Sequence, residues 1–577
     1  MLKRAKQCRL KRESGSTPSR TARQNLLEAP ASPHSEPEDE RKTSDSMNQI
    51  TDKGRKLLVE DSVHLRIAAE RLEQLGRETS SLSILQHAAG IAPADLMVNK
   101  SLFDLAFKMD EVRIAQVARN NLTTHHEPEK IKALKIASPQ INLEIIDEIS
   151  KNSTSERKKS AGNRVLYVLH NSRPFSNGGY ATRGHGLAHG LRGLGMDVVC
   201  LTRPGFPIDM DAKLNGDQVP ESEAIDGVPY FRDLLPLREK GHNTKTYAAE
   251  AANVIERRIR QLGIDCVLAA SAYVSSLPAL AAARRVGIPF IYEVRGLWEV
   301  TRYSGNPALE QSAIVKTERF LETCVARNAD AVLTLTGGMR DELIRRMVSP
   351  EKITIIPNSC DPDQFQPLDP DLSRKASLSI PEDVPVIGYL GTFVQYEGLD
   401  DLARACGLLH RRGVDFRLLL VGSENPTLNE RGPIASLVAN IAAEEGISDK
   451  LIMPGRVPHD EIRSLYSIVD IAPFPRKPQP VTEMVSPMKP LEALAMEKAV
   501  VVSSVQALQE MVHHEQTGLV FEKGNVEALA ESLYRLIQFR SLGTKLGKAG
   551  RQWVIQQRSW SHTSGMAENI IRGVCRA

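Results

Sequence analysis

The stretch PRKPQPVTEMVSPMKPLEALAMEKAVVV, residues 475–502, decides the fold of this chain. The apolar run VDIAPFP just before it predicts a buried strand, and its own second half predicts a short helix followed by another strand. A strand, a basic loop, a helix and a strand in this order are typical of an open parallel sheet, in which ligands bind beyond the carboxyl ends of the strands. We therefore expect the charged residues of this loop to meet a ligand.

Charged side chains gather where this loop joins the helix. They are Arg476, Lys477, Glu483, Lys489 and Glu492. The proline after Lys489 suits the first turn of a helix, where the helix dipole stabilises a carboxylate such as Glu492 by about 0.3–1 kcal/mol. Carboxylates accept hydrogen bonds from vicinal hydroxyls, as in a ribose, and lysine and arginine donate to phosphate oxygens. The set predicts a grip on a phosphorylated, hydroxyl-rich ligand, whereas Glu492 alone would also fit a solvated capping carboxylate.

The composition is that of a globular protein with more than one folding unit. A chain of 577 residues is too long for a single core, and its 41% apolar and 25% charged residues are ordinary for a soluble protein. The net charge of +3 gives no indication of nucleic-acid binding. The seven cysteines occur singly, without a CxxC or Cys/His cluster, so buried reduced thiols and a cytoplasmic location are expected.

The N-terminal part is expected to lie outside the sheet domains. Residues 1–50 are polar and poor in aromatics, which predicts a disordered tail. The basic MLKRAKQCRLKR has no apolar region behind it, so it is not a secretory signal, and no apolar run reaches the roughly 18 residues of a membrane span. The stretches KLLVEDSVHLRIAAERLEQLG and SLFDLAFKMDEVRIAQVARNNL are amphipathic, so residues 51–160 are predicted to be a helical appendage and a linker.

Two alternating series of strands and helices follow. The first begins with RVLYVLH at Arg164, and the second begins with VPVIGYLG and contains residues 475–502. Such alternation predicts an α/β fold of two Rossmann-like, doubly wound domains that face a cleft. We expect an N-terminal domain over 161–365, a C-terminal domain over 366–557, and a final helix over 558–577 that packs back on the N-terminal domain.

Two further loops follow strands of the first series. Gly178 and Gly179 lie where the first strand turns into its helix, where glycine lets the backbone approach a ligand and the helix N-terminus favours phosphate. The loop is not GxGxxG, so a nicotinamide cofactor is not expected, and a plain turn is the alternative. In YEVRGLWE, Glu293 could bind a hydroxyl and Arg295 a phosphate, or the two could pair and fix the loop.

The sequence predicts neither a metal site nor a cofactor. His185 and His189 are four residues apart, but HGLAH lacks the glutamate of HExxH and a third ligand. Two DPD segments, residues 361–363 and 369–371, lie in a polar, proline-rich linker, where turn formation is the expected role.

The stretch TEMVSPMKPLEALAMEKAVVVS resembles the donor-binding segment of family 4 glycosyltransferases, which have the GT-B fold. Other stretches resemble the same family in the same order, namely SNGGYATRGHGLAHGLRGLGMDVVCLTRPG, YEVRGLWE, IIPNSCDPDQF, GYLGTFVQYEGLDDL, LLLVGSENP and MPGRVPHDEIRSLYSIVDI. The resemblance spans about 164–575 and is nearest to bacterial polysaccharide-assembly transferases, including those associated with exosortase systems. The N-terminal domain then corresponds to the acceptor domain and the C-terminal domain to the donor domain.

This resemblance implies a retaining, metal-independent hexosyltransferase of cell-surface polysaccharide or glycoconjugate biosynthesis. Its partners would be a UDP- or GDP-sugar and a saccharide or lipid-linked acceptor. The implied catalytic residues are Glu483, Lys489 and Arg295. The implied donor-binding residues are Glu492, Lys489, Arg476, Lys477, Gly391, Thr392, Gly422 and Arg456. The implied phosphate and acceptor loops contribute Gly178, Gly179 and Glu293.

The chain departs from the family pattern in two places. The family commonly has two glutamates separated by seven residues, whereas Glu483 and Glu492 enclose eight, and Met484 takes the usual first position. An arginine and a lysine that the family commonly carries after the first strand of the donor domain correspond here to Thr392 and Glu397. The positive charge for a diphosphate must then come from Lys489, Arg476 and Lys477, with backbone amides near Gly391 and Thr392 as further donors.

Other functions stay open at the level of sequence. A nucleotide-sugar hydrolase or epimerase would use the same scaffold, and Thr392 and Glu397 would suit a non-catalytic scaffold protein that binds nucleotide sugars. The basic segments RRIRQLG and AARRVG predict a peripheral contact with anionic lipid at the inner membrane face, with a solvated basic face as the alternative.

Overall fold

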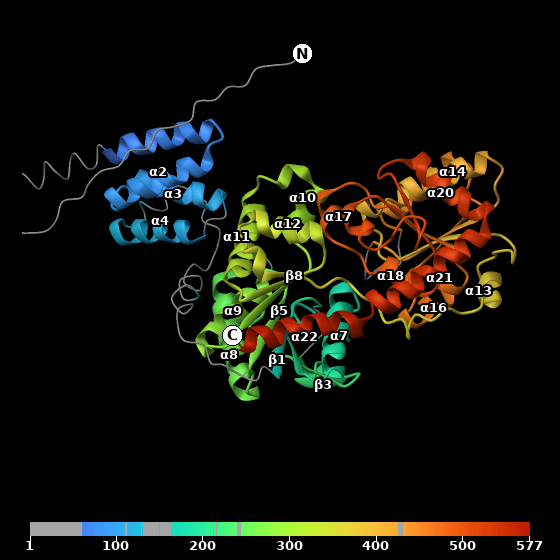
Figure 1. Ribbon diagram of the computed structural model, residues 1–577, viewed down its shortest axis with the longest axis horizontal. Helices are drawn as coiled ribbons and strands as arrows, with labels where there is room; N and C mark the ends of the chain where they lie inside the picture. Colours follow the sequence, from blue (N-terminus) through green and yellow to red (C-terminus); the bar gives the residue numbers. More distant parts are fainter. Residues whose placement is uncertain are drawn as a thin grey trace, which may run out of the picture. The chain divides into compact units, whose positions relative to one another are not determined.

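The computed structural model describes residues 61–576 apart from 110–111, 128–129, 131–148, 150–162, 212, 215, 239–243 and 425–430. The predicted tail and most of the predicted linker therefore lie outside the described residues. Two sheets made almost entirely of parallel strands confirm the predicted α/β class with two doubly wound domains (Figure 1).

A group of helices precedes the first sheet. Residues 62–74 are helical and are followed by α2 (Glu78–Ile91), α3 (Leu96–Lys108) and α4 (Val112–His125). The second amphipathic stretch therefore forms two helices rather than one, because the helix ends at Lys108 and a new one begins at Val112. The apolar positions predicted from the sequence are buried, as Ala69, Leu102 and Ala115 show.

The N-terminal sheet has eight strands in the order β3-β4-β2-β1-β5-β6-β7-β8. The strands are β1 (Arg164–Leu169), β2 (Asp197–Thr202), β3 (Ser222–Ile225), β4 (Val228–Phe231), β5 (Cys266–Ala270), β6 (Phe290–Val294), β7 (Ala331–Thr334) and β8 (Ile353–Ile355). All neighbours are parallel except β3 and β4, which form an antiparallel edge hairpin. The edge strand β3 has the residues SEAI, which are half exposed and lack an apolar run, so its sequence does not indicate a strand.

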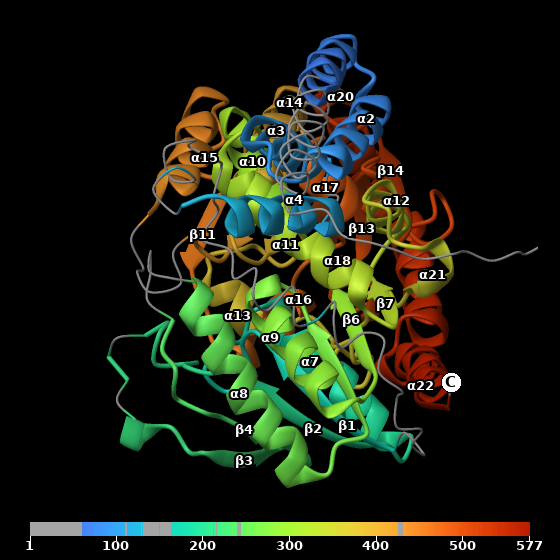
Figure 2. The same ribbon diagram turned by 90° about the vertical axis from the view of Figure 1, so that its left-hand side faces the viewer.

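Helices cover both faces of this sheet, because its strands alternate in side-chain direction. Val165 and Tyr167 of β1 belong to the core under α7 (Gly179–Gly193), whereas Leu166 and Val168 belong to the core under α8 (Thr244–Leu262) and α9 (Tyr273–Val286). Figure 2 shows α8 and α9 side by side. The remaining helices are α10 (Trp298–Gly305), α11 (Ala313–Asn328) and α12 (Gly337–Arg345).

The C-terminal sheet has six parallel strands in the order β11-β10-β9-β12-β13-β14. The strands are β9 (Val386–Leu390), β10 (Arg417–Val421), β11 (Leu451–Gly455), β12 (Ile471–Phe474), β13 (Ala499–Ser503) and β14 (Leu519–Phe521). Its helices are α13 (Leu372–Ser377), α14 (Leu399–Arg411), α15 (Pro433–Glu444), α16 (Ile462–Ser467), α17 (Pro480–Met484), α18 (Lys489–Ala495), α19 (Gln506–Gln509), α20 (Val526–Gln538) and α21 (Arg540–Gln557). Both DPD segments make turns, since Asp361 accepts from the amide of Asp363 and Asp371 caps α13.

The last helix, α22 (Trp560–Arg576), packs against α7 of the N-terminal domain. Two glycines of α7 make room for it, because a Cβ on Gly186 would lie 2.3 Å from the ring of Trp560 and one on Gly190 would lie 2.1 Å from Ser564 Oγ. The chain therefore returns to the domain in which its first strand lies.

Several sequence features have a structural role. The two ring nitrogens of His185 are hydrogen-bonded at 3.0 Å, one to Tyr230 and the other to Asp226, which suits a packed histidine.

Among the residues that the structure describes, no helix combines the length and the apolar run needed to cross a membrane. The arginines of RRIRQLG and AARRVG face carboxylates, with Arg258 at 2.8 Å from Asp233 and Arg284 at 3.0 Å from Asp330. Both arginines are largely buried beside their carboxylate partners, and a contact with lipid stays a prediction.

Candidate functional site

A cavity of about 450 Å³ opens between loops of the two domains, a size that suits a small organic ligand. The N-terminal domain lines it with Gly178, Gly179, Tyr180, Arg183, Arg295 and Asn358, among others. The C-terminal domain lines it with Gly391, Thr392, Glu397, Met488, Lys489 and Glu492, among others. These segments follow the carboxyl ends of parallel strands, which is where the sequence placed the ligand.

The structure brings about half of the predicted site residues together in this cavity. The predicted residues that line it are Gly178, Gly179, Arg295, Gly391, Thr392, Lys489 and Glu492. The predicted residues outside its lining are Glu293, Gly422, Arg456, Arg476, Lys477 and Glu483. Position alone does not test their roles, so both groups stay predictions as far as function is concerned.

Lys489 is the cation of the C-terminal domain that reaches the cavity. It begins α18, and its Nζ donates to Tyr389 Oη at 2.6 Å and to the carbonyl oxygen of Thr392 at 3.4 Å. A Cβ on Gly391, at φ +154°, would lie 2.0 Å from Lys489 Cε, so only glycine leaves room for the lysine chain. Burial lowers the pKa of Lys489, and the carboxylate of Glu397 opposes that shift.

Gly422 supports this wall from behind. A Cβ on Gly422, at φ +139°, would meet the carbonyl oxygen of Gly391 at 1.9 Å. The loops after β9 and β10 can therefore touch through their backbones. Packing therefore requires glycine at position 422, although this residue does not line the cavity.

Glu492 lies one turn after Lys489 and is partly buried in the cavity wall. Burial raises the pKa of Glu492 to about 7, and the ammonium of Lys489 works against this. The carboxyl group therefore changes charge near neutral pH, and its ionised form is the better acceptor for the hydroxyls of a diol.

Replacing Glu492 with glutamine is expected to raise stability at alkaline pH. An acid whose pKa is raised in the folded state contributes stability that is fully present below its unfolded pKa and is lost as pH rises through the folded pKa. The pKa of about 7 against an ordinary 4.5 corresponds to about 3 kcal/mol. We therefore expect Glu492→Gln to melt above the wild type at pH 8 and close to it at pH 4.5, and calorimetry at several pH values would measure this.

The control for this series is Glu445→Gln, which removes a carboxylate that faces Arg411 outside the cavity. It should shift the melting temperature far less between pH 4.5 and pH 8. A Glu492→Gln variant that melts at or below the wild type at pH 8 would show that the buried carboxyl group does not destabilise the fold.

The cations Arg476 and Lys477 are engaged with the protein. Arg476 is only 3% exposed, donates to the carbonyl oxygen of Val485 at 2.7 Å and lies over the ring of Tyr396. Lys477 donates to Asp400 at 2.6 Å. Both side chains therefore have partners within the protein, and neither lines the cavity.

Glu483 lies on α17 and also points away from the cavity lining. Its carboxylate accepts from the backbone amide of Gln506 at 2.8 Å and from Lys523 Nζ at 2.6 Å. The sequence predicted a loop where α17 lies. The extra residue between Glu483 and Glu492 occurs in the same segment, which begins with this short helix.

The N-terminal domain holds the loop around α17 at three points along its length. Ser304 Oγ accepts from the amide of Val481 at 3.1 Å, and Thr336 Oγ1 donates to the carbonyl oxygen of Met484. Asn358 Nδ2 donates to the carbonyl oxygen of Ser486 at 2.8 Å. The position of this loop therefore depends on both domains.

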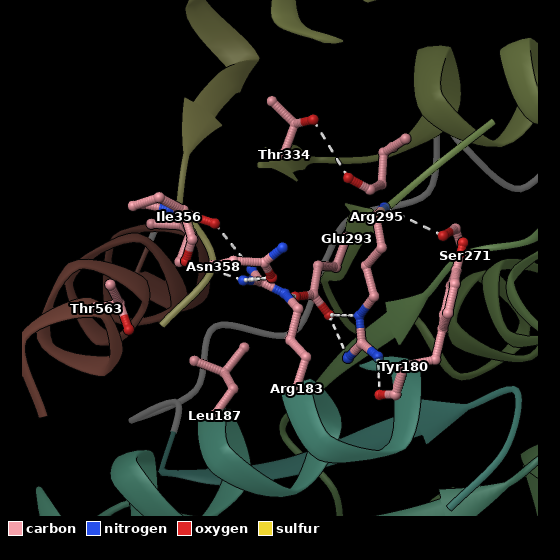
Figure 3. A network of polar contacts seen from close by, with 12 residues as sticks. Tyr180, Arg183, Leu187, Ser271, Glu293, Arg295, Thr334, Ile356, Asn358 and Thr563 are labelled. Carbon is pink, nitrogen blue, oxygen red and sulfur yellow. Dashed lines mark hydrogen bonds and ion pairs between the residues drawn. The ribbon is translucent and has the colours of Figure 1, made fainter. Parts of the chain in front are cut away.

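Behind the cavity, Glu293 joins two arginines (Figure 3). Its Oε1 accepts from Arg183 Nε at 2.8 Å and its Oε2 from Arg295 Nε at 2.9 Å, and Glu293 is fully buried. Burial opposes ionisation, but the guanidinium groups of Arg295 and Arg183 outweigh that cost and lower the pKa of Glu293 to about 2. Tyr167 Oη also donates to this carboxylate. Of the two roles weighed for Glu293 and Arg295, the structure shows the pair that fixes the loop.

Sequence reasoning missed Arg183 and Asn358. Arg183 Nη2 donates to the carbonyl oxygen of Ile356 at 2.8 Å, and its Nη1 donates to Asn358 Oδ1 at 3.1 Å (Figure 3). Asn358 thus connects α7 of the N-terminal domain with Ser486 in the loop after α17. Asn358 is visible in the sequence as the asparagine of IIPNS, and Arg183 as an arginine one turn into α7. Neither position indicates which residue its side chain contacts.

The described residues contain no group of three or more His, Cys, Asp or Glu side chains placed to hold a metal ion. The chemistry that the cavity itself offers is a lysine ammonium for an anion, a carboxyl group for hydroxyls, and backbone next to two glycines for close approach.

Two glycosyltransferase family models together match most of the chain. Residues 178–359 match the family "Glycosyl transferase 4-like domain", and residues 372–553 match the family "Glycosyl transferases group 1". The chain is 25% identical over 342 residues to alpha-maltose-1-phosphate synthase of Mycolicibacterium smegmatis, which covers 56% of this chain and 80% of that protein. It is 23% identical over 417 residues to an uncharacterized glycosyltransferase of Methanocaldococcus jannaschii, covering 71% and 98%.

Solved structures show the same fold at low identity. Sucrose-phosphate synthase from Thermosynechococcus elongatus has a TM-score of 0.58 at 20% identity and covers 71% of this chain and 99% of its own. Anabaena HepE, solved in complex with UDP-glucose, has a TM-score of 0.54 at 14% identity and covers 70% and 98%. The two-domain architecture is therefore shared with proteins whose sequences have diverged far.

Proposed function

We propose that this chain, which belongs to the family 4 glycosyltransferases of the GT-B fold, moves a sugar from a nucleoside diphosphate sugar to a saccharide or lipid-linked acceptor. The class of donor is inferred from one observation: Lys489 and Glu492 lie next to each other on one wall of the interdomain cavity. An ammonium group suits a diphosphate, and a carboxylate suits the diol of a ribose. The fold neighbour from Anabaena, solved with UDP-glucose, supports the same class of donor.

The reaction places negative charge on the leaving diphosphate. The bond between the anomeric carbon and the phosphate oxygen breaks, and the acceptor oxygen bonds to that carbon on the same face, so the configuration is retained. The acceptor proton passes to the departing phosphate oxygen. Lys489 would stabilise the growing charge, and the walls from two domains would keep water from the anomeric carbon. In this proposal side chains and backbone amides stabilise the negative charge of the leaving diphosphate without a metal ion.

We further propose that the transfer serves glycoconjugate biosynthesis and takes place in the cytoplasm. A lipid-linked acceptor would require a peripheral contact with the inner membrane face. The acceptor would approach from the N-terminal side of the cavity, which Gly178, Gly179 and Arg295 line.

A panel of nucleoside diphosphate sugars tests this function by thermal shift. A ligand at 100 times its dissociation constant stabilises a protein by about 2.7 kcal/mol, so a true donor should raise the melting temperature clearly. Turnover with the best ligand, with and without a chelator, then tests metal independence. No stabilisation by any UDP- or GDP-sugar would contradict the proposal. Rapid release of free sugar without an acceptor would indicate a hydrolase instead.

A further inference from the structure

We propose that Glu397 is a built-in counter-ion of the donor site, which holds the ammonium of Lys489 when the site is empty and weakens the hold of that ammonium on the nucleoside diphosphate product. This inference rests on the proposed function above. It assigns to Glu397 a role in setting product affinity rather than in contacting the sugar.

Glu397 is held firmly in the cavity wall. It ends the one-turn helix η4 (Gln395–Glu397), and the next residue, Gly398 at φ +75°, lies so close to Pro475 that a Cβ would meet the proline carbonyl oxygen at 2.1 Å. The amide of Lys477 donates to the carbonyl oxygen of Tyr396 at 2.8 Å. These contacts fix the loop of Glu397 against the loop after β12, so the carboxylate cannot turn out to solvent.

The carboxylate faces two cations. Its Oε1 lies 3.3 Å from Arg476 Nη2 and 3.9 Å from Lys489 Nζ, and Glu397 is only 4% exposed. Burial opposes ionisation, but Lys489 and Arg476 outweigh it and lower the pKa of Glu397, so the group is charged at neutral pH. Arg476 is held by Val485 and Tyr396, which leaves Lys489 as the partner that also reaches the cavity.

The contact with Lys489 is an ion pair without a direct hydrogen bond. The hydrogen bonds of Nζ go to Tyr389 and to the carbonyl oxygen of Thr392, and Glu397 Oε2 has no hydrogen-bond partner among the described residues. The ammonium can therefore turn toward an anion in the cavity without breaking a bond to Glu397. The negative charge stays about 4 Å away, however, and at that separation in a partly buried site it still cancels part of the attraction.

This arrangement has a consequence for turnover. A nucleoside diphosphate carries more negative charge after transfer than it did as a nucleotide sugar, so a lone lysine would hold the product more tightly than the donor. A fixed carboxylate beside that lysine reduces the affinity for both, and most for the more highly charged product. Product release limits the rate of many enzymes, so this loss of affinity favours turnover.

Isothermal calorimetry with UDP and GDP on the full-length protein tests the inference. Glu397→Gln keeps the size of the side chain and removes its charge, and we expect it to bind the nucleoside diphosphate at least about tenfold more tightly than the wild type. Glu397→Asp, which keeps the charge but withdraws it by one methylene, should fall between the two and still report if the glutamine variant does not fold. Glu445→Gln, which removes a charge outside the cavity, should bind as the wild type does.

Equal or weaker binding of the diphosphate by a folded Glu397→Gln would overturn the inference and leave the proposed function in place. No binding of UDP or GDP by the wild type and by the variants would overturn both. A lower product inhibition constant in steady-state kinetics of Glu397→Gln is the matching kinetic result expected from tighter product binding.

Discussion

Replacing Lys489 with alanine is expected to lower kcat/KM for sugar transfer by about 10²–10³-fold, which is the usual loss when one group that stabilises transition-state charge is removed. Lys489 is the cation of the C-terminal domain that lines the cavity, whereas Arg476 and Lys477 contact partners outside it. Among the described residues of the C-terminal domain no second cation lines the cavity, and the two arginines on the opposite wall are held by Glu293. Initial rates of nucleoside diphosphate release, measured with saturating acceptor, would give the value.

The matched control is Lys477→Ala, which removes the same type of side chain from the same segment between β12 and β13. Lys477 is paired with Asp400 outside the cavity lining, so its loss should change kcat/KM less than tenfold. Circular dichroism spectra of both variants should match the wild type. Full activity in Lys489→Ala, or an equal loss in both variants, would contradict the assignment of Lys489 to the donor diphosphate.

The sheets could be predicted from the sequence because their strands are buried on both faces. Runs such as AVVVS of β13 and CVLAA of β5 have every residue buried, which produces an unbroken apolar signal between polar loops. An edge hairpin gives no such signal, and β3 with its residues SEAI was missed for that reason. The helix α10 was missed because Gly305, Asn306 and Pro307 end it after two turns, so its residues did not show a long periodic pattern.

The core of the site could be predicted as well, because it depends on position along the chain. Lys489 and Glu492 are three residues apart in one helical turn that follows a buried strand, and this spacing alone places both at the ligand edge of the sheet. Arg476 and Lys477 have an equally suitable position, but their partners decide their direction. The carbonyl oxygen of Val485 and the carboxylate of Asp400 are set by tertiary packing, which a local pattern does not contain.

The least predictable part of the site is the network behind it. Asn358 contacts Arg183 across 175 residues of sequence and Ser486 across 128, so no local spacing could have paired them. The same holds for Glu293, whose partner Arg183 lies 110 residues away. A charged residue in an apolar strand was visible in FIYEV, and a buried charge must be paired, but the sequence did not show with what.

Replacing Glu293 with glutamine is expected to cost the fold about 3–5 kcal/mol, because it leaves the guanidinium groups of two buried arginines without their shared counter-charge. Arg183 and Arg295 are almost completely buried and cannot turn to solvent. The substitution should also disturb the cavity wall, because Arg183 holds the segment that contains Asn358 in place. Denaturant unfolding followed by circular dichroism at pH 7 would measure the change in stability.

The pH dependence distinguishes a lost charge from lost packing. A carboxyl group whose pKa is lowered in the folded state contributes stability that is fully present above its unfolded pKa and is lost as pH falls through its folded pKa. For Glu293 these values are 4.5 and about 2, so the gap between wild type and Glu293→Gln should be constant from pH 7 to pH 5 and narrow below 4.5. Glu531→Gln, which removes an exposed carboxylate that pairs with Arg412 on the protein surface, should cost no more than about 1 kcal/mol. A gap that persists unchanged in acid would show that shape, rather than charge, is what Glu293 contributes.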